Sequence, residues 1–310
     1  MSLVNIDRMN ILFFILNFTN LEEDKLINKN INSIKMRNII LPKNESIRQM
    51  CIVVLFLLLP LFGQCQSGDE EAAEPSKKLI WQDEFNYNGY PDQSKWSYEV
   101  GFIRNNEPQY YTEKRLKNAK VEDGMLVITA YQEDYKDAKY TSASINTKGK
   151  FHFTKGRIEV KAKLPAGKGV WPAIWTLGTN IGQVGWPECG EIDIMEYWGR
   201  NPNSVHANVH TGDYNHSIGK GRGGKITYEK PWEDFHVFAV EWYDDRLDFF
   251  LDGNQYYTCE RKGEGIGEWP FVDPQYLLIN LALTRGEDSI DDSIFPVEYL
   301  VDYVRIYSFE

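Results

Sequence analysis

The chain is poor in cysteine, which limits how it can be held together. Four cysteines occur in 310 residues, too few and too scattered for the disulfide framework of a small secreted domain. Cys51 and Cys65 lie in an N-terminal region that does not resemble folded sequence, so Cys189 and Cys259 remain for the domain. We expect both to be free, buried thiols.

Basic residues are fewer than acidic residues. The chain has 34 Lys and Arg against 45 Asp and Glu, a formal net charge of −11 at pH 7. This charge opposes binding to the phosphates of nucleic acids and to other anionic polymers. We therefore expect no nucleic-acid partner, and a neutral polymer fits better than a sulfated one.

Hydrophobic runs long enough for a membrane span are missing. The apolar residues 51–63 follow Lys43 and Arg48 and match the core of a signal peptide, well short of the ~20 residues of a membrane helix. Residues 61–65 resemble a bacterial lipobox, in which Cys65 would carry the lipid anchor. Ordinary secretion is the alternative, so we expect an exported protein, either a cell-surface lipoprotein or a secreted one.

These features divide the chain into three parts. Residues 1–65 are predicted to be a leader or signal region, with Met36 as an alternative start. Residues 66–78 are polar and acidic, and their composition predicts a flexible linker. Residues 79–310 are long enough for one large domain and contain no internal repeat.

Helical periodicity is absent over any long window of the domain. Residues 124–130, 156–163, 235–242 and 298–307 instead have the alternating, β-rich composition of strands. Turn signals at residues 244–245 and 252–254 predict hairpins. Many short strands without helices predict an all-β fold, a β-sandwich of two sheets.

Aromatic residues are abundant. They make up 14% of the chain and include nine Trp and eighteen Tyr. Aromatic rings present flat apolar faces on which sugar rings stack, although a protein core also uses such rings. The composition suits carbohydrate recognition without requiring it.

Three carboxylates occur within six residues of an apolar, strand-like run, at Glu191, Asp193 and Glu196. Strand alternation places the first two on one face and Ile192 and Ile194 on the other. Unbroken alternation would send Glu196 to the isoleucine face, where an unpaired charge is costly. We therefore predict a β-bulge near residues 194–195 that returns Glu196 to the other acids.

Three adjacent carboxylates repel one another, so at least one pKa must rise. Retaining glycosidases use such groups, with two carboxyls about 5–5.5 Å apart acting as nucleophile and as acid/base. Glu191 and Glu196 are the candidate pair, with Asp193 between them. An acidic strand edge or a calcium site is the alternative interpretation of the same spacing.

The sequence Glu-Ile-Asp-Ile-Met-Glu at residues 191–196 resembles the signature of family 16 glycoside hydrolases. The flanking residues 186–190 and 197–199 resemble its laminarinase branch, the endo-β-1,3-glucanases. The resemblance implies a concanavalin A-like β-jelly-roll with an open substrate cleft. It also implies Glu191 as the nucleophile, Asp193 as its helper and Glu196 as the acid/base.

Tryptophans near the acids are the candidate sugar platforms. Trp171 and Trp175 share one strand face, opposite Ile174, and the resemblance favours sugar stacking over burial in the core. Trp186 and Trp198 flank the acids in the sequence and are the next candidates.

Two further stretches supply polar candidates. Residues 205–210 alternate strictly, with His206, Asn208 and His210 on one side; we reject a zinc site there because no third ligand is evident. The resemblance implies that His210 touches the sugar near the nucleophile. It also implies that Asn105, in residues 104–112, donates hydrogen bonds to sugar hydroxyls.

The resemblance implies that no cofactor takes part in the chemistry and that a structural calcium is bound away from the cleft. The matching positions are Glu84, the carbonyl of Gly124, and Asp302, an oxygen-only set that suits calcium. We also expect the protein to be a monomer.

The leading hypothesis is a retaining endo-glycosidase that hydrolyses β-1,3-glucan. A mixed-linkage β-1,3-1,4-glucanase or an agarase-type galactanase would use the same chemistry, because the cleft loops decide the substrate. Residues 284–288 depart from the glycine-rich, tryptophan-containing loop of the relatives and leave the exact glucan open. A non-catalytic glucan-binding module is the alternative from another class, although such modules typically lack the acids.

Overall fold

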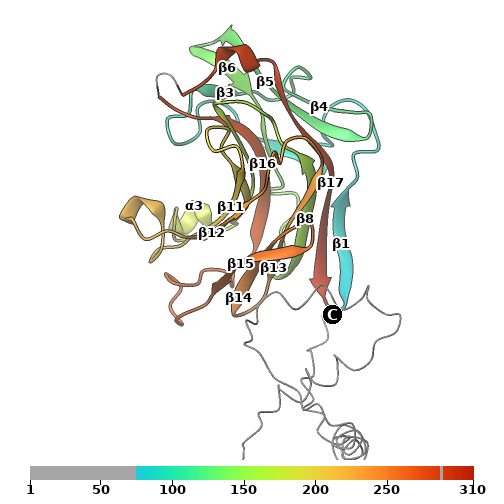
Figure 1. The fold of residues 1–310 in the computed structure, drawn as a ribbon. Helices are drawn as coiled ribbons and strands as arrows, with labels where there is room; N and C mark the ends of the chain where they lie inside the picture. The colour runs from blue at the N-terminus through green and yellow to red at the C-terminus, as the bar shows by residue number, and fades with distance from the viewer. Residues whose placement is uncertain (1–74, 287–288) are drawn as a thin grey trace, which may run out of the picture. The chain divides into compact units, whose positions relative to one another are not determined.

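Strands dominate the structure, as the sequence pattern predicts. It is a computed structural model that describes residues 75–286 and 289–310, and in this part of the chain seventeen strands form two sheets (Figure 1). Helices in the same residues are limited to single turns: α3 (Ile181–Val184), η2 (His216–Ile218) and η3 (Asp292–Ile294). The predicted all-β class is confirmed.

The first sheet has ten strands, eight of them in the order β15-β14-β13-β8-β17-β5-β6-β3, with β1 paired to β17 and β4 to β5. Their bounds are β1 (Lys77–Asp83), β3 (Gln109–Tyr111), β4 (Ala119–Glu122), β5 (Met125–Tyr135), β6 (Ala138–Ser142), β8 (Gly156–Lys163), β13 (His236–Trp242), β14 (Arg246–Leu251), β15 (Asn254–Glu260) and β17 (Val297–Phe309).

The second sheet has seven strands in the order β12-β11-β10-β9-β16-β7-β2. Their bounds are β2 (Ser97–Tyr98), β7 (Ser144–Asn146), β9 (Val170–Gly178), β10 (Glu191–Tyr197), β11 (Ser204–His210), β12 (Arg222–Thr227) and β16 (Gln275–Leu283). The predicted acidic strand, β10, is thus an interior strand, paired on both sides.

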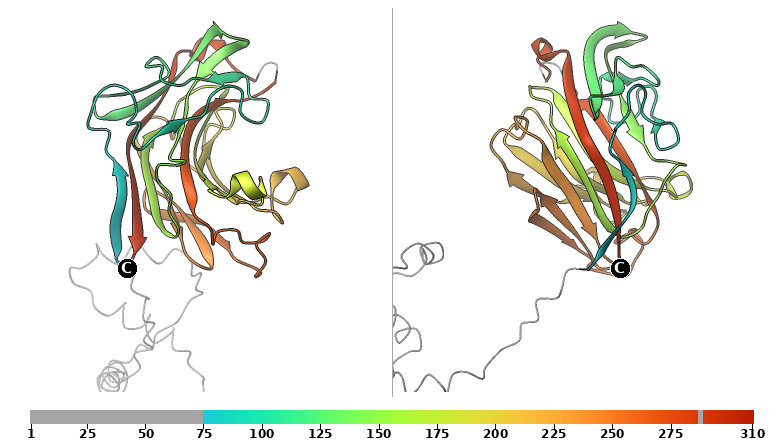
Figure 2. Two further views of the ribbon diagram at one scale, coloured as in Figure 1. Left: turned by 180° about the vertical axis from the view of Figure 1, so that it is seen from behind. Right: turned by 90° about the vertical axis from the view of Figure 1, so that its right-hand side faces the viewer.

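The two sheets form two layers, with β17 and β1 in one and β16, β11 and β12 in the other (Figures 1 and 2). α3 lies on the side of the seven-stranded sheet that faces away from the ten-stranded sheet (Figure 1). One large apolar core fills the space between the layers and includes Ile192 of β10, Leu277 of β16, Val160 of β8 and Tyr299 of β17. This is the predicted β-sandwich, of the jelly-roll type.

Both predicted hairpins form. Residues 243–245 connect β13 to β14, and Asp252 and Gly253 alone connect β14 to β15. Asp252 (φ 51°) and Gly253 (φ 77°) both have a left-handed backbone. A two-residue loop with two positive φ values matches the right-handed twist of the flanking strands, which explains the Asp-Gly sequence.

The domain starts slightly earlier than its composition suggests. Lys77 and Lys78 were assigned to the linker, but both belong to β1, which pairs in antiparallel fashion with the last residues of β17. The backbone pairing offered by β17 outweighs the unfavourable composition of two adjacent lysines. The predicted leader, with Cys51 and Cys65, and most of the predicted linker lie outside the described residues.

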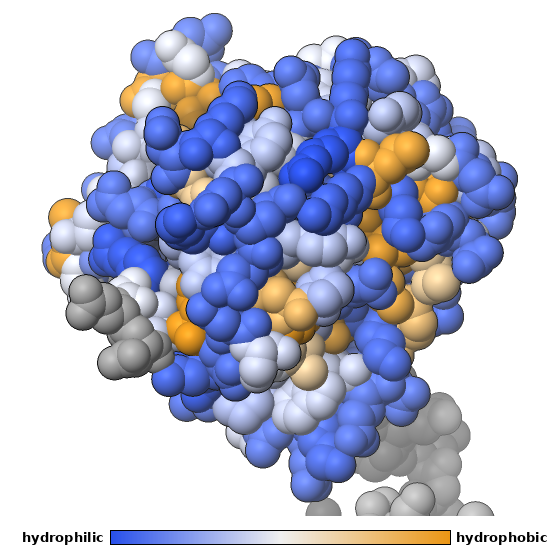
Figure 3. All heavy atoms as spheres, turned by 90° about the horizontal axis from the view of Figure 1, so that it is seen from above, coloured by the Kyte–Doolittle hydropathy of each residue, from blue (hydrophilic) through white to orange (hydrophobic). Residues whose placement is uncertain are grey.

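The two cysteines of the domain, Cys189 and Cys259, are free and buried, as predicted. In residues 75–286 and 289–310, none of the helices has the length and apolar character needed to cross a membrane. Seen from above, the surface is largely hydrophilic, with several separate hydrophobic patches (Figure 3).

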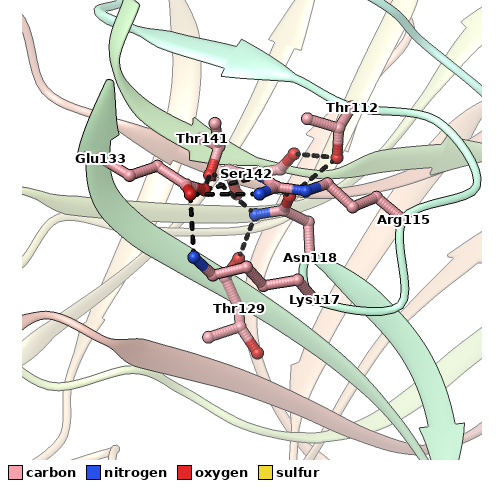
Figure 4. A network of polar contacts seen from close by, with 8 residues as sticks. All are labelled: Thr112, Arg115, Lys117, Asn118, Thr129, Glu133, Thr141 and Ser142. Atoms are coloured by element: carbon pink, nitrogen blue, oxygen red, sulfur yellow. Dashed lines mark hydrogen bonds and ion pairs between the residues drawn. The ribbon is translucent and has the colours of Figure 1, made fainter. Parts of the chain in front are cut away.

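A buried polar network fixes the segment before β4 to the β5–β6 hairpin (Figure 4). Asn118, fully buried, accepts hydrogen bonds from Thr112 and Arg115 and donates to the Thr129 carbonyl and the Thr141 hydroxyl. A second group in this network is the Glu133 carboxylate, which accepts from both terminal nitrogens of Arg115 (2.7 and 3.1 Å), from Lys117 and from Thr141. The network supplies hydrogen-bond partners to buried polar side chains such as that of Asn118, which backbone pairing between strands does not satisfy.

The network predicts acid-sensitive stability. Hydrogen bonds from Arg115 lower the pKa of Glu133 from 4.5 to about 2. A carboxyl with a depressed native pKa stabilises the fold above its unfolded-state pKa, and this contribution is lost as pH falls towards the native value. The substitution Glu133→Gln should therefore lower the free energy of unfolding by about 1 kcal/mol near neutral pH. The deficit should shrink below about pH 4.5.

Chemical denaturation of both proteins across this pH range measures the difference. Asp134→Asn is the matched control, because Asp134 is an exposed neighbour on the same strand whose single ion pair, with Lys139, is also exposed. A Glu133→Gln deficit that does not change with pH would contradict the assigned role of the charge.

Candidate active site

A β-bulge in β10 brings the three acids to one face. The pairing of β10 with β11 shifts register between Asp193 and Glu196, and its pairing with β9 shifts between Asp193 and Met195. Across the bulge, Glu191, Asp193 and Glu196 lie opposite alternate residues of β11, 210, 208 and 206. Alternate residues of a strand share a face, so the acids do as well, and the predicted bulge is present.

The opposite face of β10 anchors the strand. Ile192, Ile194 and Met195 are fully buried in the core between the sheets. The bulge gives this face two consecutive core residues, Ile194 and Met195, and the acids are therefore held on a strand that cannot rotate without exposing its apolar side.

Asp193 and Glu196 are buried and Glu191 is partly exposed, and the two outer acids have hydrogen-bond donors. The Trp186 indole N–H donates to Oε2 of Glu191 (2.8 Å), and the Trp171 indole N–H donates to Oε1 of Glu196 (3.0 Å). The side-chain amide of Asn208 donates to the other oxygen of Glu196. Each of the two outer acids is therefore fixed in orientation by a tryptophan.

His210 lies beside Asp193 and Glu191. Its Nε2 lies 3.3 Å from Oδ2 of Asp193 and 3.9 Å from Oε1 of Glu191. Ligand atoms of Glu191, Asp193 and His210 all lie within 4.8 Å of one another, a set that could hold a metal ion. The spacing of His206 and His210 did not indicate these two acids as neighbours of His210. His206 is not part of this set and packs instead against Trp198, with ring centroids 4.7 Å apart.

Burial raises the pKa of all three carboxyl groups. For Glu191, burial raises the pKa well above its usual value, and the charges of Asp193 and Glu196 add to the rise. Burial and the charge of Glu196 do the same for the pKa of Asp193. Burial also raises the pKa of Glu196, while hydrogen bonds from Asn208 and Trp171 oppose the rise. All three acids therefore bind protons more tightly than isolated carboxyl groups do.

The acids line a pocket of about 500 Å³, within the usual range for ligand sites. Its floor consists of side chains of β9, β10 and β16, and one wall is the loop between β2 and β3. The lining residues used below are Glu99, Arg104, Asn105, Glu107, Trp171, Trp175, Trp186, Glu191, Asp193, Glu196, His216 and Asn280.

The pocket contains three of the four predicted tryptophans. Trp171 and Trp186 line it beside the acids, and Trp175 lies directly opposite Asp193 across the β9–β10 pairing. Trp198 does not line the pocket; its ring packs against that of Trp171, with centroids 5.8 Å apart. Trp198 thus supports a neighbouring platform.

Asn105 lies where the resemblance suggests, on the loop wall of the pocket. It has a left-handed backbone (φ 57°), a conformation that asparagine tolerates better than most residues. Its side-chain amide donates to Glu107 (3.1 Å), and its carbonyl accepts from Arg285 (3.2 Å). The loop therefore presents Asn105 in a fixed orientation.

The residues predicted to bind calcium have other partners. Both oxygens of Glu84 accept hydrogen bonds from Arg305 (2.7 and 2.9 Å), and Asp302 pairs with Lys161 (2.7 Å). Gly124 occupies the turn between β4 and β5 with φ +75°. Both oxygens of Glu84 and one oxygen of Asp302 are thus engaged, so calcium binding at these residues would require the acids to exchange partners.

Some pocket residues were not singled out from the sequence, although Arg104 and Glu107 lie in the predicted substrate loop at residues 104–112. His216, in η2, packs against the rings of Trp186 (5.2 Å) and His210 (5.1 Å). Glu107 is buried in the loop wall and accepts from Gln109. Arg104 covers the ring of Trp175. No spacing motif marks these residues, because loop packing alone brings them to the cleft.

A β-sandwich whose carboxylates accept hydrogen bonds from tryptophans in a pocket fits a glycosidase that acts on polysaccharides. Comparisons with known proteins agree with this class of enzyme. The profile described as "Glycosyl hydrolases family 16" matches residues 106–303. The chain belongs to this family and is a glycoside hydrolase, as the resemblance implied.

Individual relatives are consistent with this assignment. The chain is 42% identical over 274 residues to a beta-glucanase of Rhodothermus marinus, covering 84% of this chain and 96% of the relative. It is 39% identical over 250 residues to a glucan endo-1,3-beta-glucosidase of Cryptopygus antarcticus, covering 72% and 90%. The solved laminarinase of Rhodothermus marinus superposes with a TM-score of 0.74 at 43% identity, covering 76% of this chain and 99% of that one.

Proposed function

We propose that the protein is a retaining endo-β-1,3-glucanase in which Glu191 is the nucleophile and Glu196 the acid/base. The observation that carries the proposal is the row of three acids on one face of β10, whose outer members each accept a hydrogen bond from a tryptophan N–H. The relatives named as glucan endo-1,3-beta-glucosidase and laminarinase support the β-1,3 linkage.

The reaction proceeds in two displacements. Glu191 attacks the anomeric carbon while Glu196 protonates the departing glycosidic oxygen, which gives a glycosyl-enzyme. Water then attacks the same carbon, Glu196 accepts its proton, and Glu191 is released as a carboxylate. Both steps use groups of the chain alone, so the chemistry needs no cofactor.

The environments of the acids fit these roles. Burial and the charges of the other two acids raise the pKa of Glu191, while the Trp186 donor and the nearby His210 oppose this rise and favour the ionised form that a nucleophile needs. Burial raises the pKa of Glu196, which favours the protonated form that the first step requires. Asp193 lies between the two, and a proton on it reduces repulsion while the charge passes along the row.

The first test is hydrolysis of a soluble β-1,3-glucan by the wild type, Glu191→Ser and Glu196→Gln. Each substitution should reduce kcat by about a thousandfold or more, because it removes a group that acts in the transition state. Glucan binding, measured by calorimetry, should persist. Glu188→Gln is the matched control, since Glu188 is an exposed acid three residues before Glu191.

A panel of laminarin, mixed-linkage β-1,3-1,4-glucan and agarose separates the substrate alternatives. A preference for galactan would contradict the proposed substrate. A wild type that binds glucan without hydrolysing it would support the non-catalytic binding module instead.

The role of Glu196 also predicts a shift in pH dependence. The Asn208 amide stabilises the Glu196 carboxylate and lowers its pKa. The substitution Asn208→Ala should therefore raise this pKa, and the alkaline limb of the kcat/KM profile should move up by about one pH unit. Trp171→Phe removes the second donor and should act in the same direction. A shift to lower pH in either variant would argue against Glu196 as the acid.

A structural calcium at Glu84, Gly124 and Asp302 is also part of the proposal, with a role in stability alone. Arg305 and Lys161 would have to release the acids, so binding should be weak. Millimolar calcium should raise the Tm of chelator-treated protein by about 2–4 °C for each kcal/mol of binding energy and leave kcat unchanged. An unchanged Tm would remove calcium from the proposal.

We further propose export of the protein, with Cys65 lipidated at the cell surface or with simple secretion as the alternative, and a monomeric state. The signal-like residues 51–63 and the lipobox-like residues 61–65 support export. Mass spectrometry of the mature N-terminus distinguishes an acylated Cys65 from an unmodified terminus, and an uncleaved leader would contradict both forms of export.

A further inference from the structure

Arg104 covers the face of one predicted sugar platform. It lies in the loop between β2 and β3, and its guanidinium carbon is 4.7 Å from the centroid of the Trp175 ring. Trp175 is only 6% exposed and lies opposite Asp193 on the floor of the pocket. A sugar ring cannot stack on this face while the guanidinium lies there.

The arginine is held in this position from a second side. Its Nη2 pairs with Glu99, whose other carboxylate oxygen accepts a hydrogen bond from the Ser144 hydroxyl of β7 (2.6 Å). Trp175 is also fixed, because its indole N–H donates to Asn280 of β16 (2.7 Å). Stacking and ion pairing together restrain the guanidinium, which lowers the entropic cost of using it to bind a ligand.

Arg104 has donor capacity to spare. Among residues 75–286 and 289–310, its only hydrogen-bond partner is Glu99, which engages Nη2 and leaves Nε and Nη1 without a partner. The side chain lines the same pocket as the three acids. The free Nε–H and Nη1–H groups point in different directions within the guanidinium plane, and each can donate to a separate hydroxyl oxygen.

We propose that Arg104 is a specificity-determining residue that binds the sugar unit beside Asp193 through its hydroxyls. The proposal rests on the proposed function and refines it. Trp175 serves as a base for the guanidinium, so this part of the cleft recognises the positions of hydroxyl groups. Trp171 and Trp186 remain available for stacking beside the cleavage point.

The test compares Arg104→Ala and Arg104→Lys with the wild type on β-1,3-linked gluco-oligosaccharides of increasing length. Arg104→Ala should raise KM about tenfold for oligosaccharides that reach this position, because a charge-assisted hydrogen bond is lost. The kcat should stay close to that of the wild type, since the contact is made equally in the ground and transition states. Arg104→Lys should recover only part of the loss, because an ammonium keeps the charge but lacks the planar guanidinium with its two fixed, separate donors.

Arg246→Ala is the matched control. Arg246 also stacks on an aromatic ring, Tyr243 (3.9 Å), and pairs with an acid, Asp248 (2.8 Å), but it lies on β14 of the other sheet. Its removal should leave KM unchanged, and thermal unfolding of all variants reports any loss of folding.

Calorimetric Kd values in a Glu191→Ser background separate this proposal from the proposed function, because they need no hydrolysis. An equal or lower Kd after Arg104→Ala would overturn the role of Arg104 and indicate that sugars stack on Trp175 itself. Failure of the proposed function would appear separately, as a wild type that cleaves no β-glucan. A wild type that binds no β-1,3-oligosaccharide would overturn both.

Discussion

Placing three carboxylates side by side on a buried strand face is the constraint that most of the cleft serves. Each acid loses hydration on burial, and each repels its neighbours, so the arrangement persists only with donors nearby. Trp171, Asn208 and Trp186 donate to the outer acids, and His210 lies beside Asp193. These donors do not fully compensate for burial and repulsion, so the pKa values of the acids stay raised. Acid–base catalysis makes use of raised pKa values of this kind.

The sandwich provides the rigidity that the acids need. β10 pairs with β9 and β11 on its two sides, and its apolar face is locked into the core. The same pairing that positions the acids also positions their donors, since Asn208 lies opposite Asp193 and His210 opposite Glu191. Catalytic geometry therefore depends on strand register, which an apolar face enforces strongly.

Local sequence predicted those features that depend on near neighbours. The alternation around Ile192 and Ile194 predicted a bulge, because without one Glu196 would point into the core. The Asp-Gly pair at 252–253 predicted a tight hairpin. Arg104 and His216 were not predictable, because loops distant in sequence bring them to Trp175 and Trp186. The assignment of Lys77 and Lys78 to the linker was wrong for a similar reason, since the strand that pairs with them, β17, lies at the far end of the chain.

The tryptophans of the cleft differ in what their N–H groups bind, and this difference separates catalysis from specificity. Trp171 and Trp186 donate to Glu196 and Glu191, so any change in these rings alters sugar binding and the acids together. Trp175 donates to Asn280, which is not one of the acids. Arg104 can therefore cover the ring of Trp175 without disturbing the hydrogen bonds of the acids. Substrate preference can change at that position while the two-carboxylate chemistry stays the same.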